Sequence, residues 1–121
     1  MLTLSPRTRV FLALGATDMR KSFDTLAQLV RDQLSEDPLS GHLFVFANRL
    51  RNRIKVLFFD GSGLWVMAKR LEKGTFAWPK GAGREGRSVA MTTTELSMLV
   101  SGIEVSNTRL RRWYRRSEGA A

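Results

Sequence analysis

The residues of this chain that could carry a chemical role are mainly its basic side chains. The 121 residues include 20 Lys and Arg against 11 Asp and Glu, which gives a formal net charge of +9, and fifteen of the basic residues are arginine. Arginine binds phosphate through two parallel hydrogen bonds and stacks on flat rings, so this bias favours nucleic acid as the partner. The competing interpretations are another acidic macromolecule and a basic surface that has no partner. The candidate nucleic-acid-binding residues are Arg20, Lys21, Arg49, Arg51, Arg53, Lys55, Lys69, Arg70, Lys80, Arg84, Arg87, Arg109, Arg111, Arg112, Arg115 and Arg116.

The first basic segment is predicted to lie at a helix N-terminus. If Thr17 or Asp18 caps a helix, Arg20 and Lys21 lie beside free backbone N–H groups that attract phosphate. The alternative is a capped helix whose first turn happens to be basic, with Asp18 or a bound anion compensating for the unfavourable dipole interaction.

The second basic segment has arginine at every second position. In an extended chain Arg49, Arg51 and Arg53 would share one side, with Lys55 beyond them, and could straddle a phosphate backbone. The alternative is a solvated loop whose charges block sheet-to-sheet aggregation.

Aromatic residues near the cations suggest two further sites. Trp65, Met67, Lys69 and Leu71 alternate along one face of a predicted strand, near Phe76 and Trp78, a pattern typical of a platform that stacks single-stranded bases. A chain this small needs its aromatic residues for the core, so we favour burial of this group. Residues 109–116 contain five arginines with a tryptophan and a tyrosine, which indicates nucleic-acid contact or a disordered solubilising tail.

No arrangement of residues indicates catalysis. The chain has no cysteine, which excludes a disulfide framework, a thiolate zinc site and a cysteine nucleophile. The single histidine, His42, begins a predicted strand, where we expect a surface or structural role. Asp18, Asp60 and Glu95 are assigned to caps and a turn. Residues 81–86 fit a dinucleotide-binding fingerprint by letter only, without the required hydrophobic setting. We therefore expect no catalytic residue, no metal and no cofactor.

Strands must position most of these cations. Short apolar segments separated by turns predict an antiparallel β-meander of four to five strands. The predicted strands are 9–15, 42–48, 53–59, 64–71 and 75–78. Along the third of these, Ile54, Val56 and Phe58 share one face. Residues 80–90 are predicted to form a flexible basic loop.

Two helices complete the predicted α+β fold. A long helix with apolar residues at helical spacing follows the first strand and ends at Pro38. A shorter helix follows the meander, with Thr92 and Glu95 as a capping box, Met91 and Leu96 as a hydrophobic staple, and Gly102 as a C-cap.

The chain length indicates one domain. We assign residues 1–104 to a single α+β domain and 105–121 to a basic C-terminal tail. No apolar run reaches the roughly 18 residues of a membrane span, and the apolar segment 10–14 is too short for a signal peptide. We therefore expect a cytoplasmic protein with no membrane partner, whose oligomeric state the sequence leaves open.

Three stretches of the chain resemble a known family. They are ATDMRKSFDTLAQLV (16–30), GHLFVFANRLRNRIKVLFFDGSGLWVMAKRLEKGTFAWP (41–79) and MTTTELSMLVSGIE (91–104). They are similar to TnpB, the accessory protein encoded by the second open reading frame of insertion sequences of the IS66 type, and not to the RNA-guided nuclease that shares this label. Residues 105–118 depart from the tryptophan- and arginine-rich end of that family, although their basic character persists.

The resemblance implies a small protein that is encoded beside a separate DDE transposase and supports transposition. It supplies no catalytic residue. Combined with the charge, it leads to the hypothesis of a non-enzymatic DNA-binding factor that contacts insertion-sequence ends through its arginine-rich loops and tail. The alternative is a protein-interaction module that docks on the transposase and contacts DNA only indirectly. A nuclease is a third interpretation, which metal-dependent nicking of supercoiled DNA would be needed to support.

Overall fold

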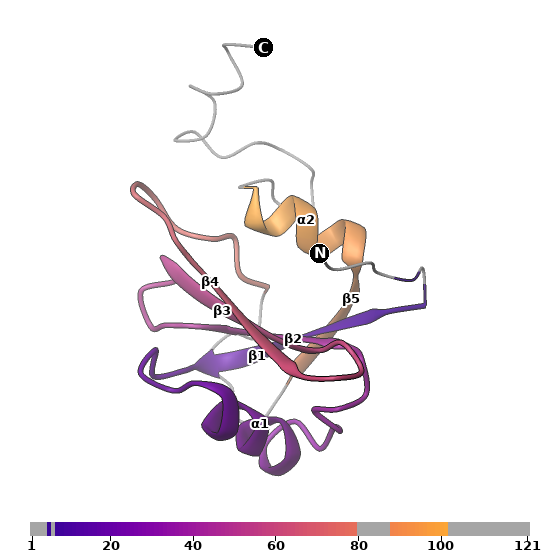
Figure 1. Ribbon diagram of the computed structural model, residues 1–121. Coiled ribbons are helices and arrows are strands. Elements are labelled where there is room, and N and C mark those ends of the chain that lie inside the picture. The colour runs from indigo at the N-terminus through magenta and orange to yellow at the C-terminus, as the bar shows by residue number, and fades with distance from the viewer. Residues whose placement is uncertain (1–4, 6, 80–87, 102–121) are drawn as a thin grey trace.

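The structure is a computed structural model that describes residue 5, residues 7–79 and residues 88–101. Its centre is a five-stranded sheet (Figure 1). The strand order is β4-β3-β2-β1-β5. The elements are β1 (Arg9–Ala16), α1 (Phe23–Asp32), β2 (Leu43–Ala47), β3 (Arg53–Phe59), β4 (Leu64–Arg70), β5 (Ser88–Thr92) and α2 (Thr93–Val100). The described helices are too short to cross a membrane. The α+β composition is thus confirmed, and the predicted tail 105–121 lies outside the described residues.

The sheet is mixed, so the prediction of a purely antiparallel meander is wrong. β1 and β2 pair in parallel, whereas β2, β3 and β4 form an antiparallel meander. The reason is α1, because a helical crossover returns the chain to the end of the sheet at which the previous strand began. β5 then pairs antiparallel with β1, which makes β1 an interior strand.

The predicted strand at 75–78 is also wrong. Residues 75–79 do not form a strand in the described structure. The Phe76 N–H donates to the Arg51 carbonyl oxygen (2.7 Å), and the Phe76 side chain is buried. The last strand of the sheet begins at Ser88, within the segment predicted to be a basic loop. The rest of that segment, 80–87, lies outside the described residues.

Helix α1 begins at Phe23, with Ser22 as its N-cap, and not at the predicted Thr17 or Asp18. The Thr17 N–H donates to the Ala47 carbonyl oxygen (2.8 Å), which extends the pairing of β1 with β2 beyond Ala16. The Asp18 carboxylate then accepts from the Arg20 N–H (2.9 Å) and closes a turn. Arg20 and Lys21 therefore precede the helix. The helix ends at Asp32, with Gln33 as its C-cap, so the predicted end at Pro38 is also wrong.

The helices cover opposite faces of the sheet, which gives two apolar clusters (Figure 1). Ile54, Val56 and Phe58 share the face that packs with α2, as the alternation predicted. Leu57 and Phe44 point to the other face and pack with α1. The interior strands are apolar on both faces because both faces are covered.

Helix α2 begins at the predicted capping box. Thr92 Oγ1 accepts from the Glu95 N–H (3.1 Å), and Glu95 Oε1 accepts from the Thr92 N–H (2.9 Å). Met91 and Leu96 belong to the same apolar cluster, in agreement with the predicted staple. The helix ends with Ser101 as its C-cap, and the predicted cap Gly102 lies outside the described residues.

The turn between β3 and β4 is organised by one carboxylate, that of Asp60. It accepts from the N–H groups of Ser62 and Gly63 (2.9 Å each) and from Trp65 Nε1 (2.8 Å). The hydrogen bond from Trp65 and those from the turn lower the pKa of Asp60 well below its ordinary value.

We expect Asp60→Asn to reduce the loss of stability in acid. A carboxyl whose pKa is lowered by folding stabilises the protein above about pH 4, and this contribution is lost as the pH falls through the lowered pKa. The asparagine variant has no such group, so its unfolding temperature will be lower than that of the parent at neutral pH and will fall less on acidification. Thermal unfolding followed at several pH values measures this.

The matched control is Trp65→Phe, which removes only the indole donor. It should lose part of the acid sensitivity and keep the turn. Equal pH profiles for the parent and Asp60→Asn would contradict the assignment.

Candidate nucleic-acid interface

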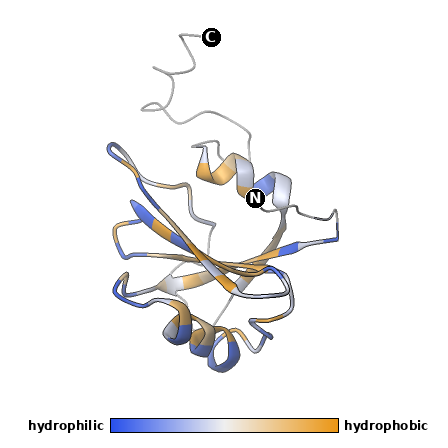
Figure 2. Cartoon of the chain, viewed as in Figure 1, coloured by the Kyte–Doolittle hydropathy of each residue, from blue (hydrophilic) through white to orange (hydrophobic). Residues whose placement is uncertain are grey.

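The structure gathers basic residues from distant parts of the sequence at one end of the sheet, which we call the basic end. β1, β2 and β4 finish there and β3 begins there, because β1 and β2 are parallel and the next two strands alternate. Figure 1 shows three loops side by side at the left, and Figure 2 colours much of them as hydrophilic. The described basic residues of this end are Arg20, Lys21, Arg49, Arg51, Arg53, Lys55, Arg70 and Lys73. Seven of them are predicted site residues. Lys73, in the segment that follows β4, was not among them.

The loops of the basic end are tied to one another. Lys55 Nζ donates to the Lys21 carbonyl oxygen (2.7 Å), which joins β3 to the loop before α1. The Leu71 N–H donates to the Asn52 carbonyl oxygen (2.8 Å), which joins the end of β4 to the start of β3. These bonds fix the backbones of the loops relative to one another, and the ammonium group of Lys55 is engaged in one of them.

Arg51 points inward, so the prediction that Arg49, Arg51 and Arg53 share one side of an extended segment is wrong. Residue 51 has a φ of 58°, which reverses the direction of the chain within a tight turn. The guanidinium lies 5.1 Å from the ring centroid of Trp78, and its Nη2 donates to the Leu14 carbonyl oxygen (2.9 Å). Nη1 is buried with no hydrogen-bond partner in the part of the chain that the structure describes, and burial lowers the pKa of Arg51. The Arg51 side chain therefore stabilises the fold by linking the β2–β3 turn to β1 and Trp78.

We expect Arg51→Ala to lower the free energy of unfolding by about 1–3 kcal/mol, through the lost charged hydrogen bond and the lost cation–π contact. Alanine has the same backbone restriction at positive φ, so the change isolates the side chain. Urea unfolding measures the effect.

The matched control is Arg49→Ala, two residues away on the exposed side of the same turn. It should leave the free energy of unfolding unchanged. A loss of stability of the same size in both variants would contradict the stabilising role of the Arg51 side chain.

Arg49 and Arg53 are exposed and form no ion pair among the described residues. Arg53 lies directly opposite Arg70 in the pairing of β3 with β4. Like charges in this position destabilise a strand pair, so an anion bound between them would be favourable. Arg70 contacts Glu72 at 3.3 Å, but both side chains are exposed and such pairs contribute little.

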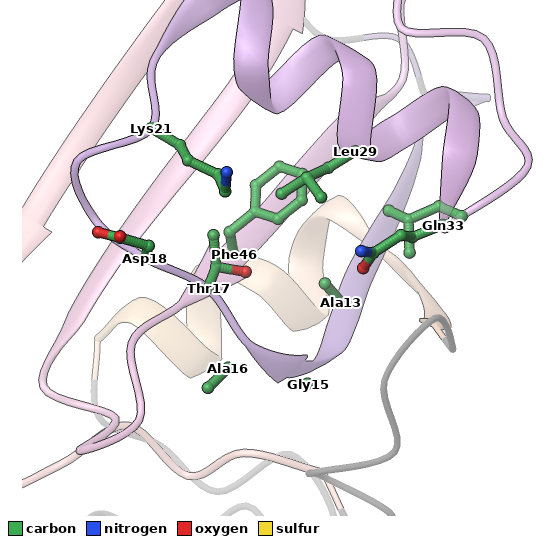
Figure 3. Close-up of a pocket in the computed structure, with 10 residues that line it drawn as sticks. Ala13, Gly15, Ala16, Thr17, Asp18, Lys21, Leu29, Gln33 and Phe46 are labelled. Atoms are coloured by element: carbon green, nitrogen blue, oxygen red, sulfur yellow. The ribbon is translucent and has the colours of Figure 1, made fainter.

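Arg20 is paired with Asp18 through Nη2 and Oδ2 at 2.7 Å. Hydrogen bonds from Arg20 lower the pKa of Asp18 to about 2, so this carboxylate is charged at neutral pH and competes with phosphate for Arg20. Lys21 and Asp18 lie on one side of a small pocket and Gln33 on the other (Figure 3). The pocket has a volume of about 110 Å³, which suits a few water molecules and not a cofactor.

Lys69 lies on the opposite face of β4 from Arg70. Its Nζ donates to the Val100 carbonyl oxygen (2.8 Å) at the C-terminal end of α2, where a positive charge is favourable. The structure therefore places Lys69 on the face of the sheet that α2 covers, away from Arg53 and Arg70 on the other face. The remaining predicted residues lie outside the described part of the chain. They are Lys80, Arg84, Arg87, Arg109, Arg111, Arg112, Arg115 and Arg116.

The residues of the predicted aromatic platform do not form one surface in the structure, because some are buried and others are exposed. Leu71 and Phe76 are buried as we favoured, whereas Trp65 and Met67 are exposed. Trp65 is held by Asp60 at the end of β4 farthest from the basic end. Met67 lines an apolar groove of about 310 Å³ between the sheet and α2. Sequence analysis missed this groove because its walls come from strands and a helix that are far apart in the chain.

The described residues contain no group of potential metal ligands. Three or more His, Cys, Asp or Glu side chains do not come together there as metal ligation requires. His42 Nδ1 accepts from the Arg9 N–H (3.0 Å), and its ring packs edge-on against Phe11. This is the structural role expected for His42.

The comparisons with known proteins identify the family. Residues 8–110 match the family described as IS66 Orf2 like protein. Two uncharacterized proteins of Sinorhizobium fredii (strain NBRC 101917 / NGR234) are similar: y4hO is 42% identical over 86% of this chain and 88% of its own length, and y4jC is 33% identical over 86% of each. No solved structure gives a significant match. The chain therefore belongs to the IS66 Orf2-like family, as its sequence blocks had indicated.

Proposed function

We propose that this protein is a non-catalytic accessory factor of insertion-sequence transposition that binds DNA in the cytoplasm. The family supplies the link to an insertion sequence. The single observation that supports DNA binding is the basic end, where the β2–β3 turn, the start of β3 and the end of β4 present Arg49, Arg53 and Arg70 on a backbone held together by hydrogen bonds. Only Asp18 and Glu72 form ion pairs with the described cations, so much of the charge is available to phosphates.

Salt-dependent binding tests this function. Fluorescence anisotropy with labelled insertion-sequence-end DNA should show affinity that falls steeply with salt, with a logarithmic slope near −5 if about six phosphates are neutralised. A variant lacking 105–121 should bind more weakly and with a smaller slope, because that segment carries five arginines. A flat salt response would contradict direct DNA binding.

The apolar groove supports a second candidate function, docking on the separate DDE transposase. Its walls include Ile54, Val56, Met67 and Leu96, and almost all of its exposed surface is apolar. An apolar contact, unlike one with phosphates, persists at high salt.

This candidate predicts that purified transposase and this protein associate without DNA and remain associated in high salt. Met67→Glu should abolish that association, whereas Leu39→Glu, an exposed apolar position outside the groove, should not. Association that requires DNA would count against docking.

A further inference from the structure

We propose that two copies of this chain pair through the free edge of β4, antiparallel about a two-fold axis at Met67, so that their sheets join into one. Such self-association is independent of the DNA-binding and docking functions above. Three features of β4 support it: its position in the sheet, the direction of its backbone groups, and the match of its side chains under two-fold symmetry.

β4 is an edge strand without a bulge. It ends the strand order of the sheet, and its residues, Leu64–Arg70, keep one register with β3 throughout. After β4 the chain turns away from this edge, because the Phe76 N–H donates to the Arg51 carbonyl oxygen (2.7 Å) and Trp78 Nε1 donates to the Ala13 carbonyl oxygen (3.2 Å). No described strand pairs with the outer side of β4. A straight, unpaired edge of this length is a template for a further strand.

The hydrogen bonds at the two ends of the β3–β4 hairpin show which backbone groups face the free edge. The Leu71 N–H donates to the Asn52 carbonyl oxygen (2.8 Å), and the Asp60 N–H donates to the Gly63 carbonyl oxygen (3.1 Å). Hydrogen-bonded pairs alternate along an antiparallel ladder, so the odd-numbered residues of β4 direct their N–H and C=O groups toward β3. The even-numbered residues therefore direct theirs outward. They are Leu64, Val66, Ala68 and Arg70.

The β2–β3 pairing gives the same alternation independently. The Asn48 N–H donates to the Arg53 carbonyl oxygen (3.1 Å), so the odd-numbered residues of β3 direct their backbone groups toward β2. The even-numbered residues of β3 are left to pair with the odd-numbered residues of β4, as the hairpin ends require.

The outward-facing residues match one another under a two-fold axis. When two β4 strands pair antiparallel with Met67 opposite Met67, Leu64 lies opposite Arg70 and Val66 lies opposite Ala68. Each of these pairs joins two outward-facing residues, so each can exchange two hydrogen bonds. The whole strand is then used, and the surface is self-complementary as a symmetric dimer requires.

The side chains of β4 fit this arrangement. Met67 is 37% exposed and would face its own copy, and Trp65, which is 46% exposed, would lie opposite Lys69. One end of β4 carries Lys69 and Arg70, whereas the other end joins the turn that the Asp60 carboxylate organises. Antiparallel pairing places the cationic end of each strand beside the Asp60 turn of the other copy. Like charges do not face each other within the paired strands, which favours a second copy as the occupant.

The edge also lacks the usual protection against pairing. Lysine on an edge strand commonly prevents strand addition, but Lys69 Nζ donates to the Val100 carbonyl oxygen (2.8 Å) at the end of α2 and is held there. The preceding stretch, Leu64–Ala68, contains no charged residue and no proline. This stretch includes the centre of the proposed pairing.

A cysteine variant of the full-length protein tests the register. The chain has no cysteine of its own, so Met67→Cys places one thiol on each side of the two-fold axis. Opposed residues at a non-hydrogen-bonded position have Cα atoms about 4.5 Å apart, which a disulfide can span. The matched control is Arg70→Cys on the same strand. Residue 70 lies opposite residue 64, so its two copies are separated along the strands by about 20 Å.

A proline variant tests the backbone pairing. Ala68→Pro removes an N–H group that faces outward, on the side of an edge strand where proline is tolerated. Sedimentation velocity is measured for the parent and the variant over a range of protein concentrations. The buffer contains about 0.3 M salt, which screens the repulsion between basic chains. Circular dichroism checks that the variant is folded.

We expect the parent to form dimers whose fraction rises with concentration. Ala68→Pro should raise the dimer dissociation constant at least about ten-fold, because symmetry removes two hydrogen bonds at once. With oxidised glutathione, Met67→Cys should become a disulfide-linked dimer and Arg70→Cys should remain a single chain.

A parent that stays monomeric at every concentration would overturn the proposal, and so would a dimer that Ala68→Pro leaves unchanged. Equal cross-linking of the two cysteine variants would show that the copies meet in another register or on another face, which also overturns it. If Ala68→Pro does not fold, the comparison of the two cysteine variants decides the matter by itself.

Discussion

Replacing Arg49, Arg53 and Arg70 together by alanine is expected to weaken duplex DNA binding several hundred-fold at about 0.1 M salt. Each phosphate contact releases about 0.9 of a counterion. Three contacts therefore account for nearly three orders of magnitude of the affinity that the protein gains between about 1 M and 0.1 M salt, and the variant loses this gain. All three side chains are exposed: Arg70 ends β4, and Arg49 and Arg53 lie at the two ends of the β2–β3 turn. The guanidinium groups of Arg49 and Arg53 make no hydrogen bond within the described part of the chain.

The variant should remain folded. Removal of the Arg53–Arg70 repulsion is expected to hold or raise the unfolding temperature, so a loss of affinity cannot be attributed to unfolding. The control is the triple alanine variant of Arg7, Arg9 and Arg31, which loses the same charge away from the basic end. Anisotropy titrations of both variants, with circular dichroism to check folding, provide the comparison. Equal losses of affinity would show that net charge, and not the basic end, determines binding.

Phe44→Ala is expected to lower the free energy of unfolding by about 3–5 kcal/mol. Phe44 is fully buried in β2, between β1 and β3, and its ring stacks on that of Phe11 with centroids 5.6 Å apart. It belongs to the cluster that holds α1 against the sheet, so truncation leaves a cavity beneath the helix. Because small domains are stable by about 5–15 kcal/mol in total, this loss approaches global unfolding.

The measurement is urea unfolding followed by far-ultraviolet circular dichroism. Phe23→Ala is the matched control, since it removes the same side chain from an exposed position on α1. Its free energy of unfolding should change by less than about 0.5 kcal/mol. A small effect of Phe44→Ala would mean that α1 is not packed on the sheet as described.

Local patterns predicted most of the elements and their buried faces. Alternation along 53–59 identified Ile54, Val56 and Phe58 as one face, and Thr92 with Glu95 located the start of α2 to the residue. These features depend on neighbours within a few positions, which the sequence displays directly.

These local patterns could not predict whether two strands pair in parallel or antiparallel. A strand that pairs in parallel carries the same alternation as one that pairs antiparallel, and the choice between them came from the crossover through α1. The start of α1 was misplaced for a similar reason. Thr17 has the right side chain for a cap, but its N–H is bound to Ala47, a residue 30 positions away.

The candidate site shows the same division. By itself the sequence determined that the protein is strongly basic, which residue types could hold phosphate, and which family it belongs to, because these properties are sums or strings of residues. Only the tertiary structure decided that Arg20, Arg49 and Arg70 lie at one end of the sheet, because that depends on which strands run parallel. It also turned Arg51 into the fold while its neighbour Arg49 remained exposed, because the sign of one backbone angle sets the direction of a side chain in a turn.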